Sequence, residues 1–245
     1  MNQRQAVIQV MKENGGYATL KHLYEHVLEI PDVKWKTKTP FASIRRIVQN
    51  EQYFFKIKPG LWALNEYKEN IPFLDNIKEN ASKKNQEEFS HSFYQGLLIE
   101  IGNLQKFNTF VPHQDKNKLY LERPLHEIST LPEMYTFSYE HIVKTAQTVD
   151  VSWFNEREFP DTFIEVEHST DFYNSLIKFV ELQDFNTNFW IAAPESRKKE
   201  FSSKLSKTAF TSINKRVRYL SYNEVSKLHS AVSEKALIES RFQDV

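Results

Sequence analysis

The segment "DTFIEVEHST", residues 161–170, decides how the second half of this 245-residue chain is interpreted. Its centre has the apolar content of a buried β-strand, yet it carries two glutamates, Glu165 and Glu167, one residue apart. Side chains alternate between the two faces of a strand, so Ile164 and Val166 share one face and both glutamates share the other. Like charges on one buried face repel each other, and the rest of the chain must supply a reason for the pair.

A third carboxylate lies on the preceding predicted strand, "TVDVSWF" at residues 148–154. The valines and the tryptophan of this strand share one face, which leaves Asp150 on the other. Glu100, on an earlier predicted helix, lies on or beside the apolar stripe of that helix. If the two strands are neighbours, the carboxylates converge at one edge of the sheet. Carboxylate oxygens suit Mg²⁺ or Mn²⁺, so the pattern predicts a site for one of these ions.

The alternative for the acid-x-acid pair is a solvated end of a strand, because clustered charges also occur for structural reasons. Asp150 within an apolar strand and Glu100 on an apolar stripe do not fit that alternative well, because unpaired carboxylates are seldom buried. The combination therefore favours a metal site.

Helical and strand patterns alternate around these two strands. Helices are predicted near residues 97–104 and at 138–147, 171–185 and 196–210. Strands are predicted at 107–112, 148–155, 162–169, 188–193 and 217–222, with 118–128 as a strand or a strand and a turn. This alternation predicts an α/β layer structure with a mixed sheet.

Asp150, followed fifteen residues later by "EVE" on the next strand, resembles the PD-(D/E)xK nuclease core. A preceding helix with a glutamate and a following helix match the αβββαβ order of that core. The resemblance covers about residues 87–222, and "FIEVEHST…LIKFVELQDF" is its most specific part. It implies a restriction-endonuclease-like fold in which Asp150, Glu165 and the backbone carbonyl of Val166 bind the metal. Glu100 would then bind or orient a second ion or a water molecule.

Glu167 departs from the pattern of that family, which has a lysine two residues after the second acid. Some restriction enzymes place a glutamate there. A glutamate cannot stabilise developing negative charge as a lysine does, but it can accept a proton from water or hold a second metal. The predicted catalytic residues are therefore Asp150, Glu165, Glu167 and Glu100.

The first 68 residues have the pattern of a separate small unit. Helices are predicted over residues 4–16, 19–28 and 39–50, with Thr19 and Thr39 as N-caps, and two strands follow within 53–67 around a Lys-Pro-Gly turn. Three helices followed by a β-hairpin resemble a winged helix-turn-helix of the HARE type, and "KPGLWAL" at the hairpin matches that family. The resemblance implies a small α+β domain that binds double-stranded DNA.

Basic residues lie where such a module would contact phosphates. They precede the third helix, lie on it or lie in the hairpin: Lys36, Lys38, Arg45, Arg46, Lys56 and Lys58. Lysine and arginine at these places neutralise phosphates and release counterions. The alternative is a winged helix that contacts protein. The module also contains His22 and His26, four residues apart, which are expected to be an exposed pair because no third ligand is evident.

A second basic stretch follows the predicted nuclease core. The residues expected to contact DNA there are Arg197, Lys198, Lys204 and Lys207. The alternative is a solvated helix face. Beside an acidic, metal-binding cleft, basic flanks would let a polyanion approach the carboxylates.

The charge distribution agrees with this reading, although the net charge is zero. Lys+Arg against Asp+Glu is 11 to 6 in residues 1–68, 10 to 20 in 69–186 and 8 to 2 in 187–220. Basic segments thus flank an acidic middle. The chain has no cysteine, which excludes disulfides and thiolate metal sites, and no run of about 18 apolar residues. We expect a cytoplasmic protein with no membrane partner.

Together these patterns predict a mixed-sheet restriction-endonuclease-like core at residues 89–245, preceded by a winged-helix domain at 1–68 and a linker at 69–88. The function expected from the resemblances is a Mg²⁺- or Mn²⁺-dependent DNA endonuclease of restriction type, acting as a homodimer. The alternative is a DNA-binding regulator or interaction protein with a degenerate, non-cleaving nuclease fold, and Glu167 is the residue that keeps this alternative open.

Overall fold

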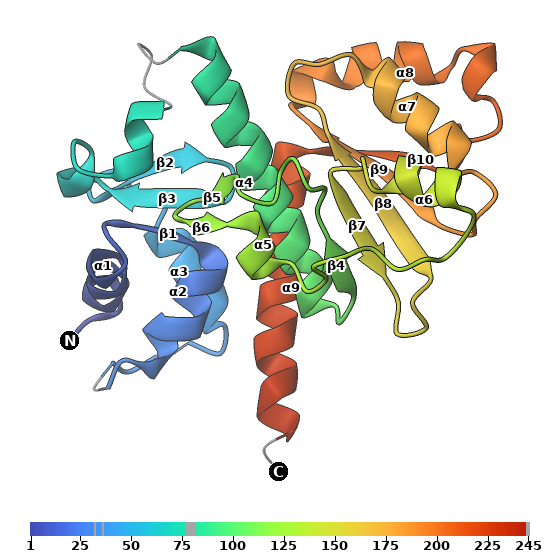
Figure 1. The fold of residues 1–245 in the computed structure, drawn as a ribbon. Coiled ribbons are helices and arrows are strands. Elements are labelled where there is room, and N and C mark those ends of the chain that lie inside the picture. The colour runs from blue at the N-terminus through green and yellow to red at the C-terminus, as the bar shows by residue number, and fades with distance from the viewer. Residues whose placement is uncertain (32, 36, 77–81, 244–245) are drawn as a thin grey trace. The chain divides into compact units, whose positions relative to one another are not determined.

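The structure is a computed structural model that describes residues 1–31, 33–35, 37–76 and 82–243. The chain forms two compact units, which are described separately (Figure 1). Unit 1 is Met1–Ala81 together with Ser226–Val245, and unit 2 is Ser82–Val225. The predicted domain borders at residues 68 and 88 stay predictions. The last twenty residues, which were expected to belong to the C-terminal domain, are grouped with the N-terminal part of the chain.

Unit 1 begins with three helices, α1 (Gln3–Glu13), α2 (Leu20–His26) and α3 (Pro40–Ile47). The side chain of Asn2 accepts a hydrogen bond from the backbone of Gln5 and starts α1, and Gly15 and Gly16 end it with φ of 76° and 91°. Thr19 caps α2 as predicted, by accepting from the backbone N–H of His22 at 3.3 Å. Thr39 occupies the N-cap position of α3, although its side chain makes no capping hydrogen bond. The three predicted helices are confirmed.

The sheet of unit 1 is antiparallel with the strand order β1-β3-β2. The predicted hairpin is confirmed as β2 (Phe54–Lys58) and β3 (Leu61–Leu64), joined at Gly60 with φ of 99°. β1 (Tyr17–Thr19) was not predicted, because its three residues are all buried and show no alternation. Short 3₁₀ helices complete this part at η1 (Val27–Glu29), η2 (Asn65–Tyr67) and η3 (Pro72–Asn76).

A long final helix, α9 (Tyr222–Gln243), was not predicted either. From Ser226 on it belongs to unit 1, where Ser230 lies 2.9 Å from the hydroxyl of Tyr24. Arg45 of α3 donates to the same tyrosine and to Glu234, at 2.9 and 2.6 Å. The contacts of Tyr24 with Ser230 and of Arg45 with Glu234 join residues about two hundred positions apart, which explains why no local pattern reveals them.

Unit 2 contains one five-stranded mixed sheet with the order β10-β9-β8-β7-β4. β7 (Val151–Phe154) pairs antiparallel with β4 (Asn108–Phe110) on one side and with β8 (Pro160–Val166) on the other, whereas β8, β9 (Asn188–Ala193) and β10 (Val217–Ser221) run parallel. The predicted mixed sheet of an α/β structure is therefore confirmed. The predicted segment at 118–128 contains the small hairpin β5 (Leu119–Tyr120) and β6 (Arg123–Pro124) and the short helix α5 (Leu125–Ile128).

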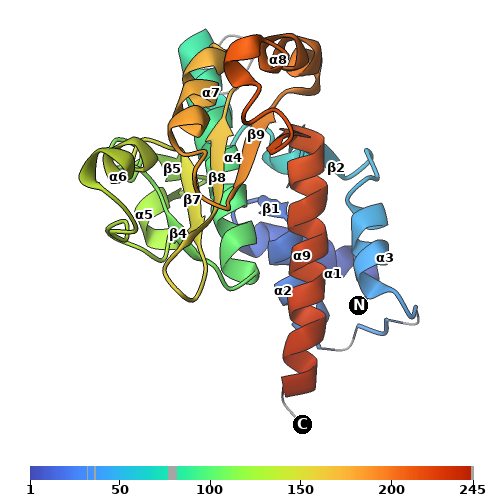
Figure 2. The ribbon, with the colours of Figure 1, turned by 90° about the vertical axis from the view of Figure 1, so that its right-hand side faces the viewer.

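Helices lie on both sides of this sheet: α4 (Lys83–Leu104), α6 (Glu140–Ala146), α7 (Phe172–Glu181) and α8 (Lys198–Leu205), with η4 (Glu195–Arg197) and η5 (Thr208–Phe210) beside α8. Figure 2 shows α7 in front of β8 and α4 behind it. The main core fills the space between the sheet and α6, α7 and α8, and includes Phe154, Phe163, Phe189, Val143, Leu176 and Phe201. Burial of these apolar side chains supplies the main free energy of folding of the unit.

On the other side of the sheet, the glycines of α4 allow close packing. A Cβ atom at Gly102 would lie 2.7 Å from the indole nitrogen of Trp153. At Gly96 it would lie 2.1 Å from the ring of Tyr120, so β5 rests directly on the helix backbone. The hydroxyl of Tyr120 donates to Glu100 at 2.9 Å, one turn further along α4. The helix thereby fixes β5 and the loop that precedes it.

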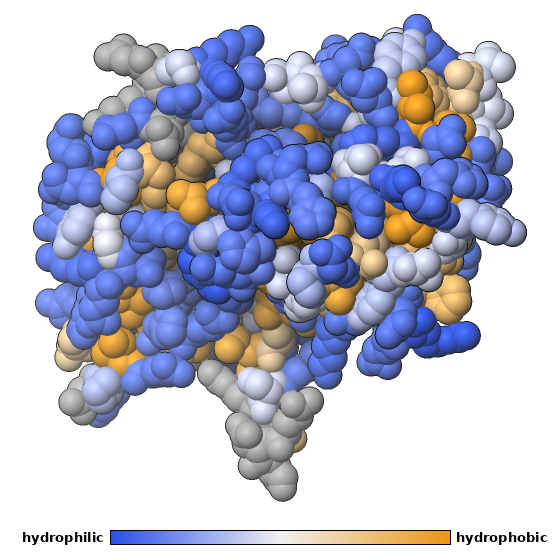
Figure 3. All heavy atoms as spheres, in the orientation of Figure 1, coloured by the Kyte–Doolittle hydropathy of each residue, from blue (hydrophilic) through white to orange (hydrophobic). Residues whose placement is uncertain are grey.

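No helix within the described residues is long and apolar enough to cross a membrane. The face drawn in Figure 3 is covered mostly by hydrophilic side chains, with hydrophobic atoms in separate patches. The exposed large apolar residues are scattered along the chain and include Tyr139, Phe159 and Ile177.

Gly96→Ala is expected to destabilise the protein. Alanine normally stabilises a helix interior over glycine by about 0.5–1 kcal/mol. Here its Cβ would lie 2.7 Å from the Cβ of Tyr120, which a rotation of the ring cannot relieve. We expect the free energy of unfolding to fall by about 1–3 kcal/mol, measured by urea denaturation. Asn85→Ala, at an exposed position of the same helix, is the control and should be neutral or slightly stabilising. A Gly96→Ala variant as stable as this control would contradict the packing of β5 on α4.

Candidate active site

Three of the predicted catalytic carboxylates meet where β7 begins and β8 ends. Val151 pairs with Ile164 across the two antiparallel strands, so Asp150 and Glu165 are opposite each other at the next position of the register. Asp150 Oδ2 accepts a hydrogen bond of 2.7 Å from the backbone N–H of Val166. The residues Asp150, Glu165 and Glu167 are only 8%, 3% and 5% exposed. The structure thus brings together three of the four predicted acids in a buried environment.

Helix α7 and the segment before it supply the partners of the two glutamates. Lys178 Nζ lies 2.8 Å from Glu165 Oε1 and also donates to the carbonyl of Thr148 at 2.8 Å. The hydroxyl of Ser175 donates to Glu165 Oε2 at 3.3 Å and to Glu167 Oε1. Thr170 donates to the other oxygen of Glu167. This side of the site therefore contains two buried carboxylates and one cation, which pairs with Glu165.

The pKa values of these groups follow from burial and charge. Burial raises the pKa of Glu165 well above its usual value, and the negative charges of Asp150 and Glu167 add to this although Lys178 opposes it. Burial also raises the pKa of Glu167 to about 7, with the hydrogen bond from Ser175 opposing and the charge of Asp150 adding. Burial lowers the pKa of Lys178, but Glu165 outweighs it and raises the pKa overall. The lysine therefore stays charged.

Helix α4 and the loop before β5 add a second group of side chains that the sequence analysis did not identify. His91 Nε2 lies 3.5 Å from Asp150 Oδ1 and 3.7 Å from Asp115 Oδ2. The amide nitrogen of Gln95 donates to Asp115 Oδ2 at 2.8 Å and to the backbone carbonyl of Asp150 at 3.1 Å. Lys118 pairs with the other oxygen of Asp115 at 2.6 Å. Asp150 is therefore shared between the two groups.

Charge also dominates the pKa values in this second group. Burial lowers the pKa of His91, but the carboxylates of Asp150 and Asp115 outweigh it and raise the pKa to about 10. Burial raises the pKa of Asp115, but the nearby imidazole of His91 and the hydrogen bonds from Lys118 and Gln95 outweigh it and lower the pKa to about 2. In the metal-free site, a proton on His91 balances part of the negative charge.

The residues that the sequence analysis missed differ in how visible they are. His91 and Gln95 are polar residues four positions apart on a mostly buried helix, which is the same signal that singled out Glu100. Asp115 lies in a polar loop, and nothing local distinguishes it from the neighbouring polar residues. Lys178 is at helical spacing from Ser175, but its approach to Glu165 depends on how α7 packs on the sheet.

Glu100 has different surroundings from the other predicted acids. It accepts the hydrogen bond from Tyr120, and it is nine residues from His91 on α4. Nine residues correspond to about two and a half helical turns, so Glu100 and His91 point from opposite sides of the helix. Glu100 thus holds β5, and with it the loop that contains Asp115.

The predicted DNA-contacting residues near α8 are placed as follows. Arg197 donates to the backbone carbonyls of Glu167 and Thr170 and pairs with Glu200. Lys204 pairs with Asp171 and Glu200, whereas Lys198 and Lys207 are exposed. Arg197 thereby ties η4 to the segment that carries Glu167.

Of the basic residues predicted to contact DNA in unit 1, Lys38, Arg46 and Lys56 are exposed. Arg45 is half-buried in its pair with Glu234, and burial lowers the pKa of Lys58. Lys36 lies outside the described residues.

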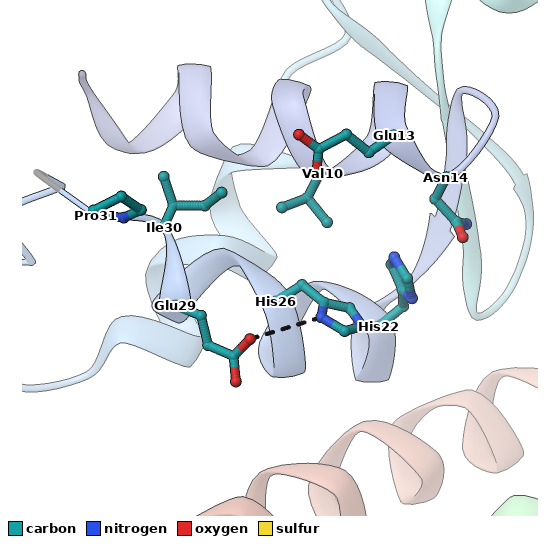
Figure 4. Close-up of a pocket in the computed structure, with 8 residues that line it drawn as sticks. All are labelled: Val10, Glu13, Asn14, His22, His26, Glu29, Ile30 and Pro31. Atoms are coloured by element: carbon teal, nitrogen blue, oxygen red, sulfur yellow. Dashed lines mark ion pairs between the residues drawn. The ribbon is translucent and has the colours of Figure 1, made fainter.

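An open pocket of about 330 Å³ in unit 1 contains the predicted histidine pair. In Figure 4 the rings of His22 and His26 lie side by side, with Glu29 next to His26 and Val10 and Glu13 across the pocket. The ring centroids are 4.4 Å apart, and His26 Nδ1 is 3.9 Å from Glu29 Oε2. These side chains do not bring three ligand atoms to within 4.8 Å of one another; within the described part of the chain, His91, Asp115 and Asp150 do.

The residues of unit 2 fit a divalent cation. Four buried carboxylates, those of Asp115, Asp150, Glu165 and Glu167, face two paired lysines, which leaves two negative charges when all are ionised and His91 is neutral. His91 Nε2 and Gln95 Oε1 are buried without a hydrogen-bond partner. Carboxylate oxygens with one imidazole nitrogen are ligands for hard or intermediate divalent metals.

Comparison with known proteins gives a match over residues 71–245 to a family model described as the type II restriction enzyme NmeDI C-terminal domain. The type II restriction enzyme NmeDI of Neisseria meningitidis serogroup C is 24% identical over 150 residues, which cover 57% of this chain and 42% of that relative. The aligned part thus spans less than half of the relative's length. No solved structure gives a significant match.

Glu167→Gln is expected to change the pH dependence of stability in the metal-free protein. The pKa of Glu167 is raised from 4.5 to about 7, so between these values the folded state keeps a proton that the unfolded state has lost. The tighter binding of this proton by the folded state adds to the free energy of unfolding. The added stability has its full value below about pH 4.5 and is lost as the pH rises through about 7. The glutamine variant has no titrating group at this position, so its stability does not fall in this way as the pH rises. Relative to the wild type it should gain stability between pH 5 and pH 8, by at most about 3 kcal/mol.

Urea unfolding in EDTA at both pH values measures this difference. Glu156→Gln, an isosteric change at an exposed position between β7 and β8, is the control and should show no such gain. A difference between the Glu167→Gln protein and the wild type that is independent of pH would contradict the buried, neutral state of Glu167.

Proposed function

This chain belongs to the family of the type II restriction enzyme NmeDI C-terminal domain, and on that basis we propose that it is a metal-dependent DNA endonuclease of restriction type. The observation that carries the proposal is the meeting of Asp150, Glu165 and Glu167 in a buried site at the junction of β7 and β8. Buried carboxylates repel one another unless a cation lies among them. Such a site next to a family match of this kind supports phosphodiester hydrolysis.

The order of elements in unit 2 supports a PD-(D/E)xK type of core. Helix α4 precedes the antiparallel strands β4, β7 and β8, and α7 connects β8 to the parallel strand β9. This is the αβββαβ order that the sequence resemblance implies. Asp150 immediately precedes β7, and Glu165 lies opposite it on the neighbouring strand β8, as the two acids of that motif would.

We assign the catalytic cation, Mg²⁺ or Mn²⁺, to the carboxylates of Asp150 and Glu165 and the backbone carbonyl of Val166. When bound, such an ion polarises the phosphate and lowers the pKa of water, which are the two requirements of hydrolysis at neutral pH. The N–H of Val166 holds Asp150 Oδ2 and thereby orients the carboxylate. Glu100 is left out of this set, because it holds Tyr120.

Lys178 and Glu167 have complementary roles in the proposal. Glu167 occupies the position at which the motif has a lysine. A positive charge is instead supplied by Lys178 of α7, whose Nζ lies 2.8 Å from Glu165 Oε1. An ammonium group there can stabilise negative charge that develops on the phosphate. Glu167, whose pKa is about 7, can take up a proton near neutral pH and is our candidate for the general base.

Plasmid cleavage tests the proposal. With Mg²⁺ or Mn²⁺, the wild type should cut DNA into discrete fragments. Asp150→Asn and Glu165→Gln should each slow cleavage by at least about 10²-fold, and Lys178→Met by a similar factor, because each removes a charge next to the reacting phosphate. The exposed, isosteric Glu156→Gln variant should cut like the wild type.

Unchanged cleavage by both carboxylate variants would contradict the assigned site. Absence of cleavage on unmodified and base-modified DNA, with DNA binding retained, would favour the second candidate, a non-cleaving DNA-binding regulator. The observation that favours this candidate is Glu167 in the place of the motif's lysine.

We further propose that unit 1 is a winged-helix domain that engages duplex DNA. Three helices followed by the hairpin β2–β3 support this, and the exposed cations Lys38, Arg46 and Lys56 are suited to phosphate contact. A homodimer is proposed by analogy with restriction enzymes that cut both strands.

Arg45 and Arg46, adjacent on α3, should respond differently to substitution. Arg46 is exposed, so Arg46→Met should weaken DNA binding and reduce the slope of log affinity against log salt by about one. Arg45 pairs with Glu234 and Tyr24, so Arg45→Met should lower stability by about 1 kcal/mol, since this pair is about a third exposed. Fluorescence anisotropy of the full chain at several salt concentrations and thermal unfolding measure the two effects. A larger loss of affinity in Arg45→Met than in Arg46→Met would contradict the assignment.

A further inference from the structure

Three side chains from α4, the loop before β5 and the start of β7 surround a second point on the other side of Asp150. One nitrogen and two oxygens, His91 Nε2, Asp115 Oδ2 and Asp150 Oδ1, all lie within 4.8 Å of one another. The nitrogen is 3.5 Å from the oxygen of Asp150 and 3.7 Å from that of Asp115. Neither distance is short enough for a good N–H···O hydrogen bond.

These separations fit ligands that share an ion. Two ligand atoms at about 2.0–2.2 Å from a metal and at a tetrahedral angle are about 3.3–3.6 Å from each other. The distance from His91 Nε2 to Asp150 Oδ1 falls in this range, and the distance to Asp115 Oδ2 is 0.1 Å beyond it. A hydrogen-bonded imidazolium would instead be expected at about 2.7–2.9 Å from one of the oxygens.

The buried polar atoms at this point give an independent indication. His91 Nε2 is buried and has no hydrogen-bond partner. Gln95 is fully buried, and its Oε1 also lacks a partner although its amide nitrogen holds Asp115 and Asp150. Polar atoms buried in a protein are nearly always paired, so the unpaired imidazole nitrogen of His91 next to two carboxylates calls for a ligand.

The two carboxylates are already oriented for such a ligand. Asp150 directs Oδ2 to the N–H of Val166 and Oδ1 toward His91. Asp115 directs Oδ1 to Lys118 and Oδ2 toward Gln95 and His91. Each acid therefore has one oxygen within reach of the imidazole, and in Asp115 that oxygen also accepts the hydrogen bond from Gln95. Such second contacts are what hold metal ligands in place.

We propose that His91, Asp115 and Asp150 form a second divalent-cation site, one that prefers ions with affinity for imidazole, such as Mn²⁺, Co²⁺ or Zn²⁺, over Mg²⁺. Asp150 is shared with the catalytic cation. A contribution of this second ion to DNA cleavage rests on the proposed function, whereas its binding depends only on the three ligands.

Pulsed electron paramagnetic resonance of the full chain with Mn²⁺ alone tests the site, because it detects an imidazole nitrogen bound to manganese. The wild type should show this nitrogen coupling, and His91→Gln should lose it. Asp115→Asn keeps the imidazole and should weaken the affinity for the Mn²⁺ ion that shows nitrogen coupling by at least about tenfold. This variant tests the site even if His91→Gln fails to fold. The neighbouring histidines His22 and His26 could also bind Mn²⁺ and give a nitrogen coupling. His26→Gln is therefore the matched control and should keep the signal.

Glu165→Gln separates this inference from the proposed function. It removes a ligand of the catalytic cation only, so it should keep the nitrogen coupling while cleavage is lost. A nitrogen coupling that depends on His91, in a protein that cuts no DNA, would support the second site and overturn the proposed function. Two results would overturn the second site alone. The first is DNA cleavage that depends on Asp150 and Glu165 in a protein that shows no nitrogen coupling. The second is a nitrogen coupling that is lost in His26→Gln and kept in His91→Gln.

Discussion

The burial of four carboxylates around the start of β7 and the end of β8 is the constraint on which the rest of unit 2 depends. Asp115, Asp150, Glu165 and Glu167 are each less than a tenth exposed, and the transfer of an unpaired carboxylate out of water is very unfavourable. Each surrounding element therefore contributes a donor: the backbone of β8, Gln95 from α4, and Ser175 and Lys178 from α7. The close approach of α4, which its glycines permit, is needed for this. The positions of the helices thus depend on the pairing of these buried carboxylates as well as on the packing of the apolar core.

Asp150 connects the two halves of this arrangement. The Val166 N–H fixes one of its oxygens on the sheet, and the other faces His91. A carboxylate with its two oxygens in different surroundings can serve two neighbouring cations, as in two-metal sites of phosphoryl-transfer enzymes. Without a cation, the site relies on a proton, since the pKa of Glu165 is raised and that of His91 is raised to about 10. Protons and metal ions would then compete for the same groups.

Much of the fold followed from local patterns, and the parts that did not follow depend on distant contacts. Strand alternation placed Glu165 and Glu167 on one face and Asp150 on the matching face of its strand, because the period of two is local. Asp115 was invisible, since a loop has no period and its importance comes from Gln95 twenty residues earlier. The grouping of α9 with unit 1 depends on Tyr24 and Ser230, which no window of sequence contains together. His91 and Gln95 had a detectable spacing on α4, and the same reasoning that selected Glu100 applied to them.

The position of the positive charge shows why a motif along one strand is an incomplete guide to chemistry. A lysine two residues after Glu165 would extend from the same strand and face as that glutamate; in this chain Glu167 occupies the place and adds a negative charge. Lys178 is thirteen residues after Glu165 in sequence, yet its ammonium lies 2.8 Å from the carboxylate, because Asp171 caps α7 and the buried Phe172 and Leu176 fix the rotation of the helix on the sheet. What phosphate chemistry requires is a charge at a point in space, and a helix that packs on the sheet can deliver it as well as the strand can. The departure at Glu167 therefore does not by itself make the site inactive.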